Sequence, residues 1–156
     1  KSNIVKDVLE NIERYSAANN HYVFEITETI EMDQIPAVQN VFKEFVKNEF
    51  RFAIDDFGTG YSNYGYMRDR TFDIVKVDRS FVTDIDKLKD NYLMVSFIIK
   101  MAHEMGLHVC IEGVETKEEL SCVKKLGADY IQGYYYGKPV CLQDFEEQHL
   151  KRFVLG

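Results

Sequence analysis

The chain has 156 residues, of which 46% are hydrophobic and 29% are charged, a composition that fits one globular domain and excludes a disordered segment or a repeat array. Its formal net charge of −7 argues against a nucleic-acid partner, which usually requires a basic face. A small phosphate ligand stays compatible with this charge, because a bound cation can reverse the local sign.

In chain order, the first half of the sequence alternates between helical and strand patterns. Apolar residues at helical spacing predict a helix over residues 4–15, and the short apolar run 22–25 predicts a strand. Pro36 fits the first turn of a second helix, which extends to about residue 46. The apolar run 51–56 then predicts the second strand.

The second half continues the alternation. The runs 72–76, 107–112 and 128–132 predict three more strands. The helix predicted over residues 91–105 has apolar residues almost all round, so we expect it to be buried on more than one side, for example in a subunit contact.

Capping signals mark the start and the end of the next predicted helix. Thr116 and Glu119 form the pattern of a capping box, and Gly127 is placed to end the helix that they begin. The segment 142–153 predicts a final helix.

This alternation, with short connections, predicts an α/β fold with a parallel sheet and right-handed crossovers. A polar group ends each of the five predicted strands, and convergence of many strand tips on one point is barrel geometry. A complete (β/α)8 TIM-type barrel needs ~200–250 residues. We therefore expect residues 1–156 to be a single N-terminally truncated partial barrel of about five parallel strands with flanking helices, whose first strands would precede Lys1.

The strand endings carry the chemistry. Four are carboxylates, one is a cation and one is an amide, and together they are Glu25, Asp55, Asp56, Glu112, Lys76 and Gln132. Such an acidic cluster raises its own pKa values unless divalent cations compensate it, and all-oxygen ligands favour Mg²⁺, Mn²⁺ or Ca²⁺. Both acids of the pair Asp55-Asp56 can reach the site only if the strand ends there and the backbone turns. The competing interpretation, acids that cap helices or end strands in solvent, explains one ending more easily than all of them.

Other polar residues fit no site. His21, His103 and His108 lie away from the strand tips, and we expect them to be structural or exposed. The tyrosines at 134–136 are more typical of packing at a barrel rim, although a base could stack on one ring.

The three cysteines, Cys110, Cys122 and Cys141, follow no ligand spacing and cannot all pair with one another. We therefore expect free thiols in a reducing compartment and a cytoplasmic location.

Five motifs resemble the EAL-domain family, bacterial phosphodiesterases that hydrolyse cyclic di-GMP on a (β/α)8 barrel. They cover nearly the whole chain in the family's order, which makes the resemblance specific. The resemblance also implies that the Glu-Ala-Leu glutamate and an asparagine ligand lie on earlier strands. The motifs are Glu25-Ile-Thr-Glu28, Asp55-Asp-Phe-Gly-Thr-Gly-Tyr-Ser62, Asp73-Ile-Val-Lys-Val-Asp-Arg-Ser-Phe81, Glu112-Gly-Val-Glu-Thr116 and Gln132-Gly-Tyr134 with Pro139.

The resemblance implies a two-metal site that holds Mg²⁺ or Mn²⁺. Glu25, Asp55 and Asp56 are its implied metal ligands, with Asp55 between the two ions. Lys76 is similar to the lysine that holds the attacking water and the phosphate charge.

Further roles follow from the same resemblance. Glu112 is similar to the candidate general base, and Gln132 to the amide that completes the cluster. Glu28 is implied to anchor the loop 55–62. The loop-anchoring or substrate-proximal residues as a group are Glu28, Gly58, Thr59, Gly60 and Glu115.

The implied function is metal-dependent hydrolysis of cyclic di-GMP to linear pGpG by the parent protein, with this chain alone expected to be inactive. The implied partners are a second copy, bound through the loop 55–62 and the helix 91–105, and companion domains such as GGDEF or a sensor. Two alternatives stay open. One is a catalytically inactive EAL-type receptor or interaction module, and the other is a fragment whose open sheet edges pair with a second copy.

Overall fold

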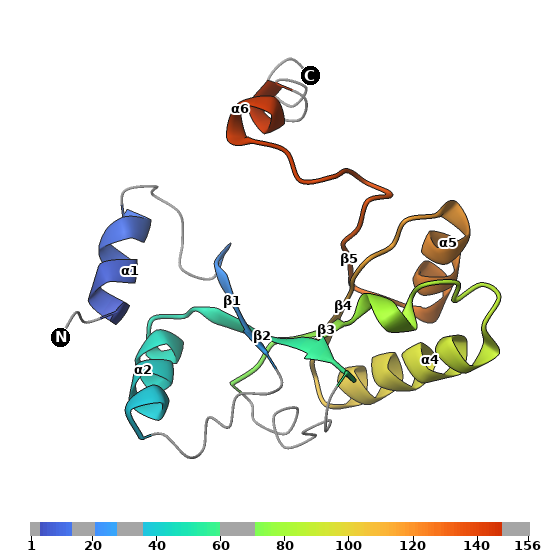
Figure 1. Cartoon of the computed structure of the whole chain (residues 1–156). Helices are drawn as coiled ribbons and strands as arrows, with labels where there is room; N and C mark the ends of the chain where they lie inside the picture. Colours follow the sequence, from blue (N-terminus) through green and yellow to red (C-terminus); the bar gives the residue numbers. More distant parts are fainter. Residues whose placement is uncertain (1–3, 14–20, 28–35, 60–70, 148–156) are drawn as a thin grey trace.

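The computed structural model describes residues 4–13, 21–27, 36–59 and 71–147. Its centre is one parallel sheet, in which the strands stand side by side in the order of the sequence (Figure 1). This order is the one found in a barrel, whereas a doubly wound sheet reverses its strand order at a crevice. The strands are β1 (Val23–Thr27), β2 (Arg51–Phe57), β3 (Ile74–Val77), β4 (His108–Ile111) and β5 (Tyr130–Ile131).

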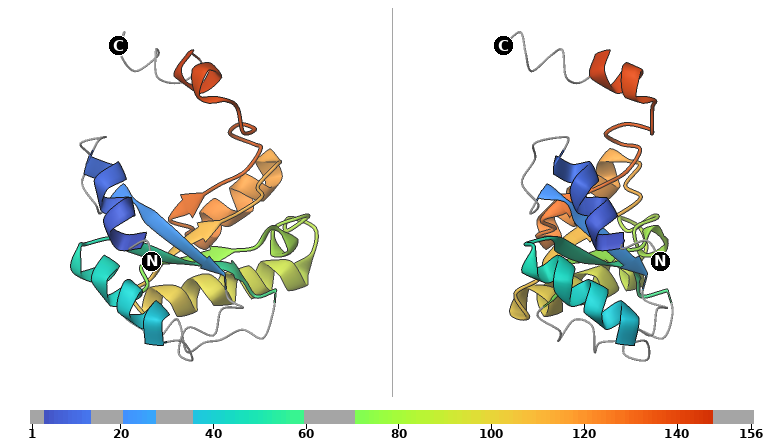
Figure 2. Two further views of the ribbon diagram at one scale, coloured as in Figure 1. Left: turned by 60° about the vertical axis from the view of Figure 1, so that its left-hand side comes forward. Right: turned by 90° about the vertical axis from the view of Figure 1, so that its left-hand side faces the viewer.

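The helices lie outside the curved sheet, and α6 stands apart from it at the end of an extended arm (Figures 1 and 2). The predicted alternation of strands and helices is therefore confirmed for the described residues. The helices are α1 (Ile4–Glu13), α2 (Pro36–Lys47), α4 (Lys89–Glu104), α5 (Lys117–Leu126) and α6 (Leu142–Phe145), with the 3-10 turn η3 (Arg79–Phe81) after β3.

Local signals fix several helix ends. Helix α2 begins at Pro36, as predicted. The capping box of α5 is present, with the Glu119 amide donating to the Thr116 hydroxyl, and Gly127 ends the helix at φ 92°. Helix α6 has four residues, so it is shorter than the predicted helix 142–153. Residues 148–153 of that prediction lie outside the described residues.

The core lies between the sheet and the helices. Strand side chains alternate between the two faces, and the face toward the helices is fully apolar. It buries Phe52, Ile54, Val75, Val77, Val109 and Ile111. The opposite face lines a hollow of about 220 Å³ that contains Glu25, Lys76, Cys110 and Gln132. The polar strand residues therefore share the face that the helices do not cover.

Helix α4 is only partly covered in this single chain. Its residues Val95, Ile99 and Ala102 are buried, but Leu93 and Phe97 are 53% and 58% exposed. Because the helix contacts β4, α5 and η3 while these side chains stay exposed, the expected burial of α4 in a subunit contact stays a prediction.

Two further predictions can be compared with the described residues. The three cysteines are free, and Cys110 and Cys122 are partly buried. None of the described helices combines the length and the apolar character that a membrane span requires.

Candidate functional site

The ends of the strands lie level with one another. Phe57 pairs with Val77, Val77 with Ile111, and Ile111 with Ile131. Because these four residues form one row, the residues around this row on each strand meet at the same edge of the sheet. The polar endings predicted from the sequence therefore do converge on one region.

Two adjacent acids reach this region through a bulge in β2. The strand ends at Phe57, one residue later than predicted, and the predicted turn of the backbone occurs at the acidic pair. The pairing with β3 shifts between Ile54 and Phe57, and Asp56 takes a left-handed conformation with φ 54°. The amide and hydroxyl of Thr59 donate to the Asp56 carbonyl at 3.2 Å and 2.9 Å, which fixes the turn.

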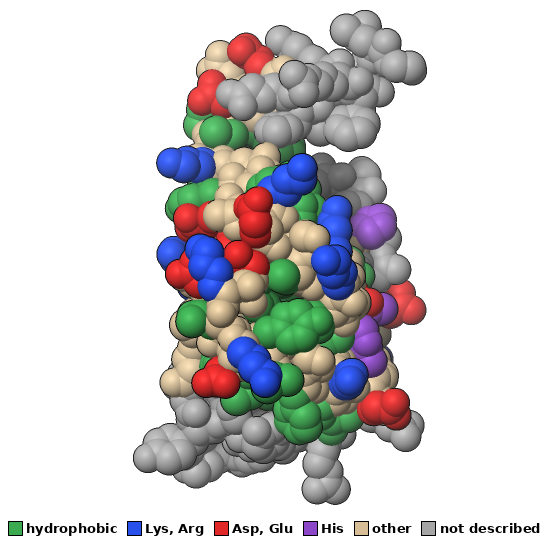
Figure 3. Space-filling view, turned by 90° about the vertical axis from the view of Figure 1, so that its right-hand side faces the viewer, with side chains coloured by type: hydrophobic (Ala, Val, Ile, Leu, Met, Phe, Trp, Pro, Cys, Tyr) green, Lys and Arg blue, Asp and Glu red, His purple; other side chains and the backbone are tan. Residues whose placement is uncertain are grey.

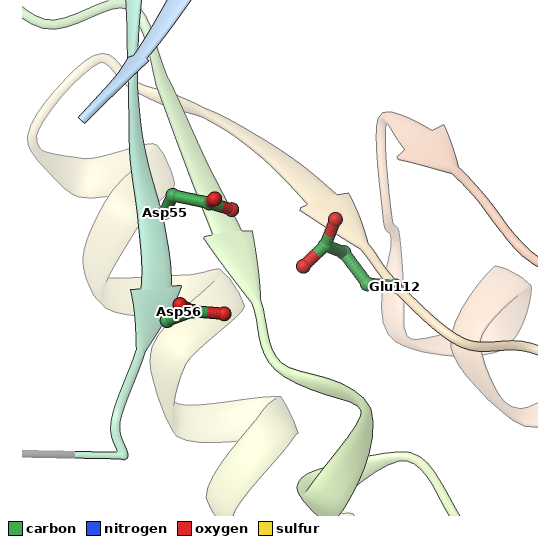
Figure 4. Close-up of side chains that lie close together, drawn as sticks. All are labelled: Asp55, Asp56 and Glu112. Carbon is green, nitrogen blue, oxygen red and sulfur yellow. The ribbon is translucent and has the colours of Figure 1, made fainter. Parts of the chain in front are cut away.

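Asp55, Asp56 and Glu112 form an acidic cluster. One carboxylate oxygen of each lies within 4.8 Å of the others. In Figure 4, the two acids of β2 point across β3 toward Glu112, which follows β4. The Glu112 amide donates to the Val77 carbonyl at 3.1 Å, so this acid is fixed to the neighbouring strand. Three convergent carboxylates fit a hard divalent cation, which prefers oxygen ligands.

Lys76 connects this cluster to β1. Its ammonium lies 2.8 Å from Glu25 Oε1, 2.8 Å from Asp55 Oδ1 and 2.9 Å from Glu112 Oε1. Burial alone would lower the pKa of Lys76, but hydrogen bonds to Asp55, Glu25 and Glu112 raise it above its ordinary value. The lysine is therefore a permanent positive charge at neutral pH.

Glu112 differs from Lys76 in the effect of burial on its pKa. Burial raises its pKa above the ordinary value, and the nearby charges of Asp55 and Glu25 act in the same direction. The hydrogen bond from Lys76 opposes this shift without reversing it. A carboxylate with a raised pKa accepts a proton more readily near neutral pH.

Gln132 and Glu115 lie beside a pocket of about 750 Å³ at the same edge of the sheet. The backbone of Gln132 is fixed to the neighbouring strand, since its backbone N–H donates to the Ile111 carbonyl at 2.8 Å. Gln132 also lines the hollow that contains Glu25 and Lys76. Tyr134 and Tyr136 line the pocket and are 53% and 55% exposed, and the ring of Tyr136 packs against that of Tyr135, so the expected packing at a barrel rim stays a prediction.

The pocket residues to which the sequence interpretation assigned no role include Asp78, Arg79 and Gly113. Arg79 Nη2 lies 3.6 Å from Glu115 Oε1. A Cβ on Gly113 would lie 2.3 Å from the Cβ of Arg79, and its φ of 70° also favours glycine. Strand alternation could have identified Asp78, which follows Lys76 by two residues and therefore shares its face.

The remaining predicted site residues lie elsewhere or are not described. Glu28 and Gly60 lie outside the described residues. Gly58, next to Thr59, lines a separate small hollow of about 80 Å³ with Phe81 and Phe97. Gly58, at the described start of this loop, therefore lies beside α4 and not in the larger pocket.

The histidines lie away from the strand tips, as predicted. His108 begins β4, and His103 lies in the last turn of α4. His103 Nε2 is 2.8 Å from Asp129 Oδ2, and His108 Nδ1 is 3.5 Å from Asp129 Oδ1. These contacts join α4 to the beginnings of β4 and β5, which is a structural role.

Comparison with known proteins adds a family to this geometry. The family model of the EAL domain matches residues 1–139. The chain is 35% identical over 144 residues, 92% of its length, to the probable cyclic di-GMP phosphodiesterase PdeA of Escherichia coli. It spans about a fifth of the length of the curated relatives it matches.

Solved structures are similar as well. The EAL enzyme Bd1971, bound to cAMP and cyclic di-GMP, superposes with a TM-score of 0.84 at 34% identity, over 94% of this chain and 39% of that one. BlrP1 of Klebsiella pneumoniae, in a complex with manganese and cyclic di-GMP, gives a TM-score of 0.79 at 27% identity, over 89% of this chain and 36% of that one. The α/β fold of TIM-barrel type, with five parallel strands and flanking helices, is thus confirmed for the described residues.

Proposed function

We propose that this chain, which belongs to the EAL domain family, forms the later strands of a barrel that hydrolyses cyclic di-GMP to linear pGpG. The observation that carries the proposal is the cluster of Asp55, Asp56 and Glu112 around Lys76 at the strand ends. The phosphodiesterase PdeA and the cyclic di-GMP complex of Bd1971 support this choice of substrate. A pocket of about 750 Å³ beside the cluster offers room for a small-molecule ligand.

Glu25, Asp55 and Asp56 would hold the metal ions. Bound Mg²⁺ or Mn²⁺ would activate a water and neutralise charge at the phosphodiester. The manganese complex of BlrP1 supports a divalent ion of this kind. The oxygen-only donor set of Asp55, Asp56 and Glu112 supports it independently.

Lys76 acts as a fixed cation. Its three carboxylate partners keep it protonated, so it cannot serve as a general base. It can offset the acids around it and the charge of a bound phosphate.

Glu112 is the better candidate for a base, because burial raises its pKa and so makes its carboxylate a stronger proton acceptor than an exposed glutamate. Gln132 would complete the cluster from β5, and Glu115 would contact the substrate from the pocket wall. Glu28, Gly58, Thr59 and Gly60 would hold the loop that follows the acidic pair.

We propose that a second copy binds at α4. Met94, Phe97 and Gly58 line one small hollow, so the start of the loop after β2 lies next to exposed apolar side chains of α4. Figure 3 shows that basic side chains on the face it displays alternate with acidic and hydrophobic ones. This mixture does not favour a nucleic-acid partner.

Further strands would complete the barrel, since β1 and β5 each pair on one side only among the described residues. The complete protein would then be cytoplasmic in this domain and carry companion domains such as GGDEF or a sensor. Sequencing of the natural gene and cell fractionation would test both points.

The activity is tested in the natural full-length protein with Mn²⁺ or Mg²⁺ and cyclic di-GMP. Lys76→Ala and Glu112→Gln should each lower kcat by about 10²-fold or more, because each removes a group at the reacting centre. Lys124→Ala on the outside of α5 is the matched control and should leave kcat unchanged. Unchanged turnover in either site variant contradicts the assigned roles, and tight binding without hydrolysis by the wild type indicates a receptor instead.

A further inference from the structure

Glu119 is a buried carboxylate that lies outside the pocket. It is 6% exposed, and it is the only acidic residue among the buried polar side chains of the described part of the chain. Its Oε2 accepts the amides of Glu115 at 2.9 Å and Thr116 at 3.0 Å, and its Oε1 accepts the amide of Asp84 at 3.1 Å. Burial alone would raise the pKa of Glu119, but these backbone hydrogen bonds lower it below its ordinary value.

A helix cap requires only part of this arrangement. The bond to the Thr116 amide belongs to the capping box of α5. The bond to Asp84 is different, because Asp84 lies 35 residues earlier, in the connection between β3 and α4. Glu119 therefore joins the connection after β3 to the connection after β4.

The segment held through Asp84 is continuous with the pocket wall. The Thr83 amide donates to the Arg79 carbonyl at 2.9 Å, and the Leu88 amide donates to the Asp84 carbonyl at 2.8 Å. Asp84 also takes a left-handed conformation with φ 55°, which an aspartate tolerates better than most residues but which needs support. A shift of Asp84 would therefore be transmitted along hydrogen bonds to Arg79.

The two connections meet inside the pocket. Arg79 comes from the first and Glu115 from the second, and their charged groups lie 3.6 Å apart. Arg79 and Gly113 approach so closely that no side chain fits between the two segments. The relative position of the two segments thus determines the shape of one pocket wall.

We propose that Glu119 is a positioning residue, whose carboxylate locks the two connections together and thereby places Arg79 and Glu115 against the phosphodiester ligand. This inference rests on the proposed function for the identity of the ligand. It assigns Glu119 to ligand binding rather than to the acidic cluster, which it does not contact.

Glu119→Gln is the primary test, because one carboxylate oxygen becomes an NH2 donor that would face a backbone N–H donor, either that of Asp84 or those of Glu115 and Thr116. In the full-length protein with Mn²⁺, we expect KM for cyclic di-GMP to rise about tenfold, while kcat stays within about twofold. Glu119→Asp keeps the charge but shortens the side chain, so KM should rise less. Thr116→Ala is the matched control, since it weakens the same helix start without removing the bond to Asp84.

A KM for Glu119→Gln no higher than that of Thr116→Ala overturns the proposal. If the glutamine variant does not fold, the aspartate variant decides by the same comparison. Should the wild type hydrolyse no cyclic dinucleotide, the proposed function fails, and amide hydrogen exchange then tests the lock alone. Faster exchange over residues 79–88 in Glu119→Gln than in Thr116→Ala supports the lock, and equal exchange overturns it.

Discussion

At the scale of single residues, buried charges in this protein are stable only because each has several partners. Lys76 is 5% exposed and contacts three carboxylates from three different strands or strand ends. An unpaired charge at such a site would be strongly destabilising. Asp129, an exposed residue at the opposite end of the sheet, also has several partners, since its carboxylate accepts the Val109 amide at 2.7 Å beside His103.

Asp129→Asn should lower the free energy of unfolding at pH 7 by about 1 kcal/mol, because it removes a charged but solvent-screened acceptor that joins α4 to β4. Burial alone would raise the pKa of Asp129, but hydrogen bonds from His103, Val109 and His108 hold it below the ordinary value of 3.8. A lowered pKa stabilises the fold above pH 3.8, and this contribution is lost as the pH falls through the pKa of the folded state.

Urea unfolding of the wild type and of Asp129→Asn at several pH values measures the difference in their free energies of unfolding. The difference should be largest near neutral pH and should shrink below pH 3.8. Asp144→Asn on α6 is the control, since Asp144 lies on the exposed arm. A difference that grows toward acid would contradict the assigned role of the carboxylate.

At the scale of elements, the site depends on irregular backbone at the ends of regular strands. The bulge at Asp56 brings two adjacent acids to one side, which a straight strand cannot do. Helix α4 has two different sides. One side packs on the sheet, and the other exposes Leu93, Met94 and Phe97. An apolar helix side of this kind favours a protein contact.

Phe97→Ser should therefore weaken self-association of the full-length protein. The side chain is 58% exposed and lines the hollow beside Gly58, so its loss removes apolar area from the proposed contact while leaving the core intact. Sedimentation velocity should show a dimer for the wild type and a shift toward monomer for the variant. Lys125→Ser on α5 is the control, and a dimer that persists equally in both variants would place the contact elsewhere.

At the scale of the whole molecule, the sheet gathers like charges at one edge. Glu25, Asp55, Asp56 and Glu112 come from three strands, and Lys76 supplies a single positive charge among them. This imbalance opposes folding through repulsion, and a bound divalent ion would relieve it. The site and the stability of the fold are therefore coupled.

Mn²⁺ should raise the melting temperature of the full-length protein. At a free concentration of 100 Kd, binding to the folded state alone adds about 2.7 kcal/mol to the free energy of unfolding. Asp55→Asn should remove most of this shift, whereas Asp144→Asn should keep it. Calorimetry with and without Mn²⁺ at constant ionic strength measures it, and an equal shift in both variants would exclude Asp55 as a ligand.

The sequence by itself determined the elements and the identity of the groups at the strand ends. The start of α2 at Pro36, the capping box of α5 and the polar endings at Lys76 and Glu112 all depend on residues a few positions apart. Local periodicity and capping chemistry are therefore enough to predict them. The ordered motifs are also enough to indicate the family from the sequence alone.

Only the tertiary structure decided how those groups are arranged. It brought Lys76 to three acids from separate strands, turned Asp56 with a bulge inside β2, paired Arg79 with Glu115, and placed Asp84 on Glu119. It also showed the outer side of α4 to be exposed. Each of these features depends on contacts between segments that are distant in the sequence, and the register and packing of such segments are set by the whole sheet rather than by any local pattern.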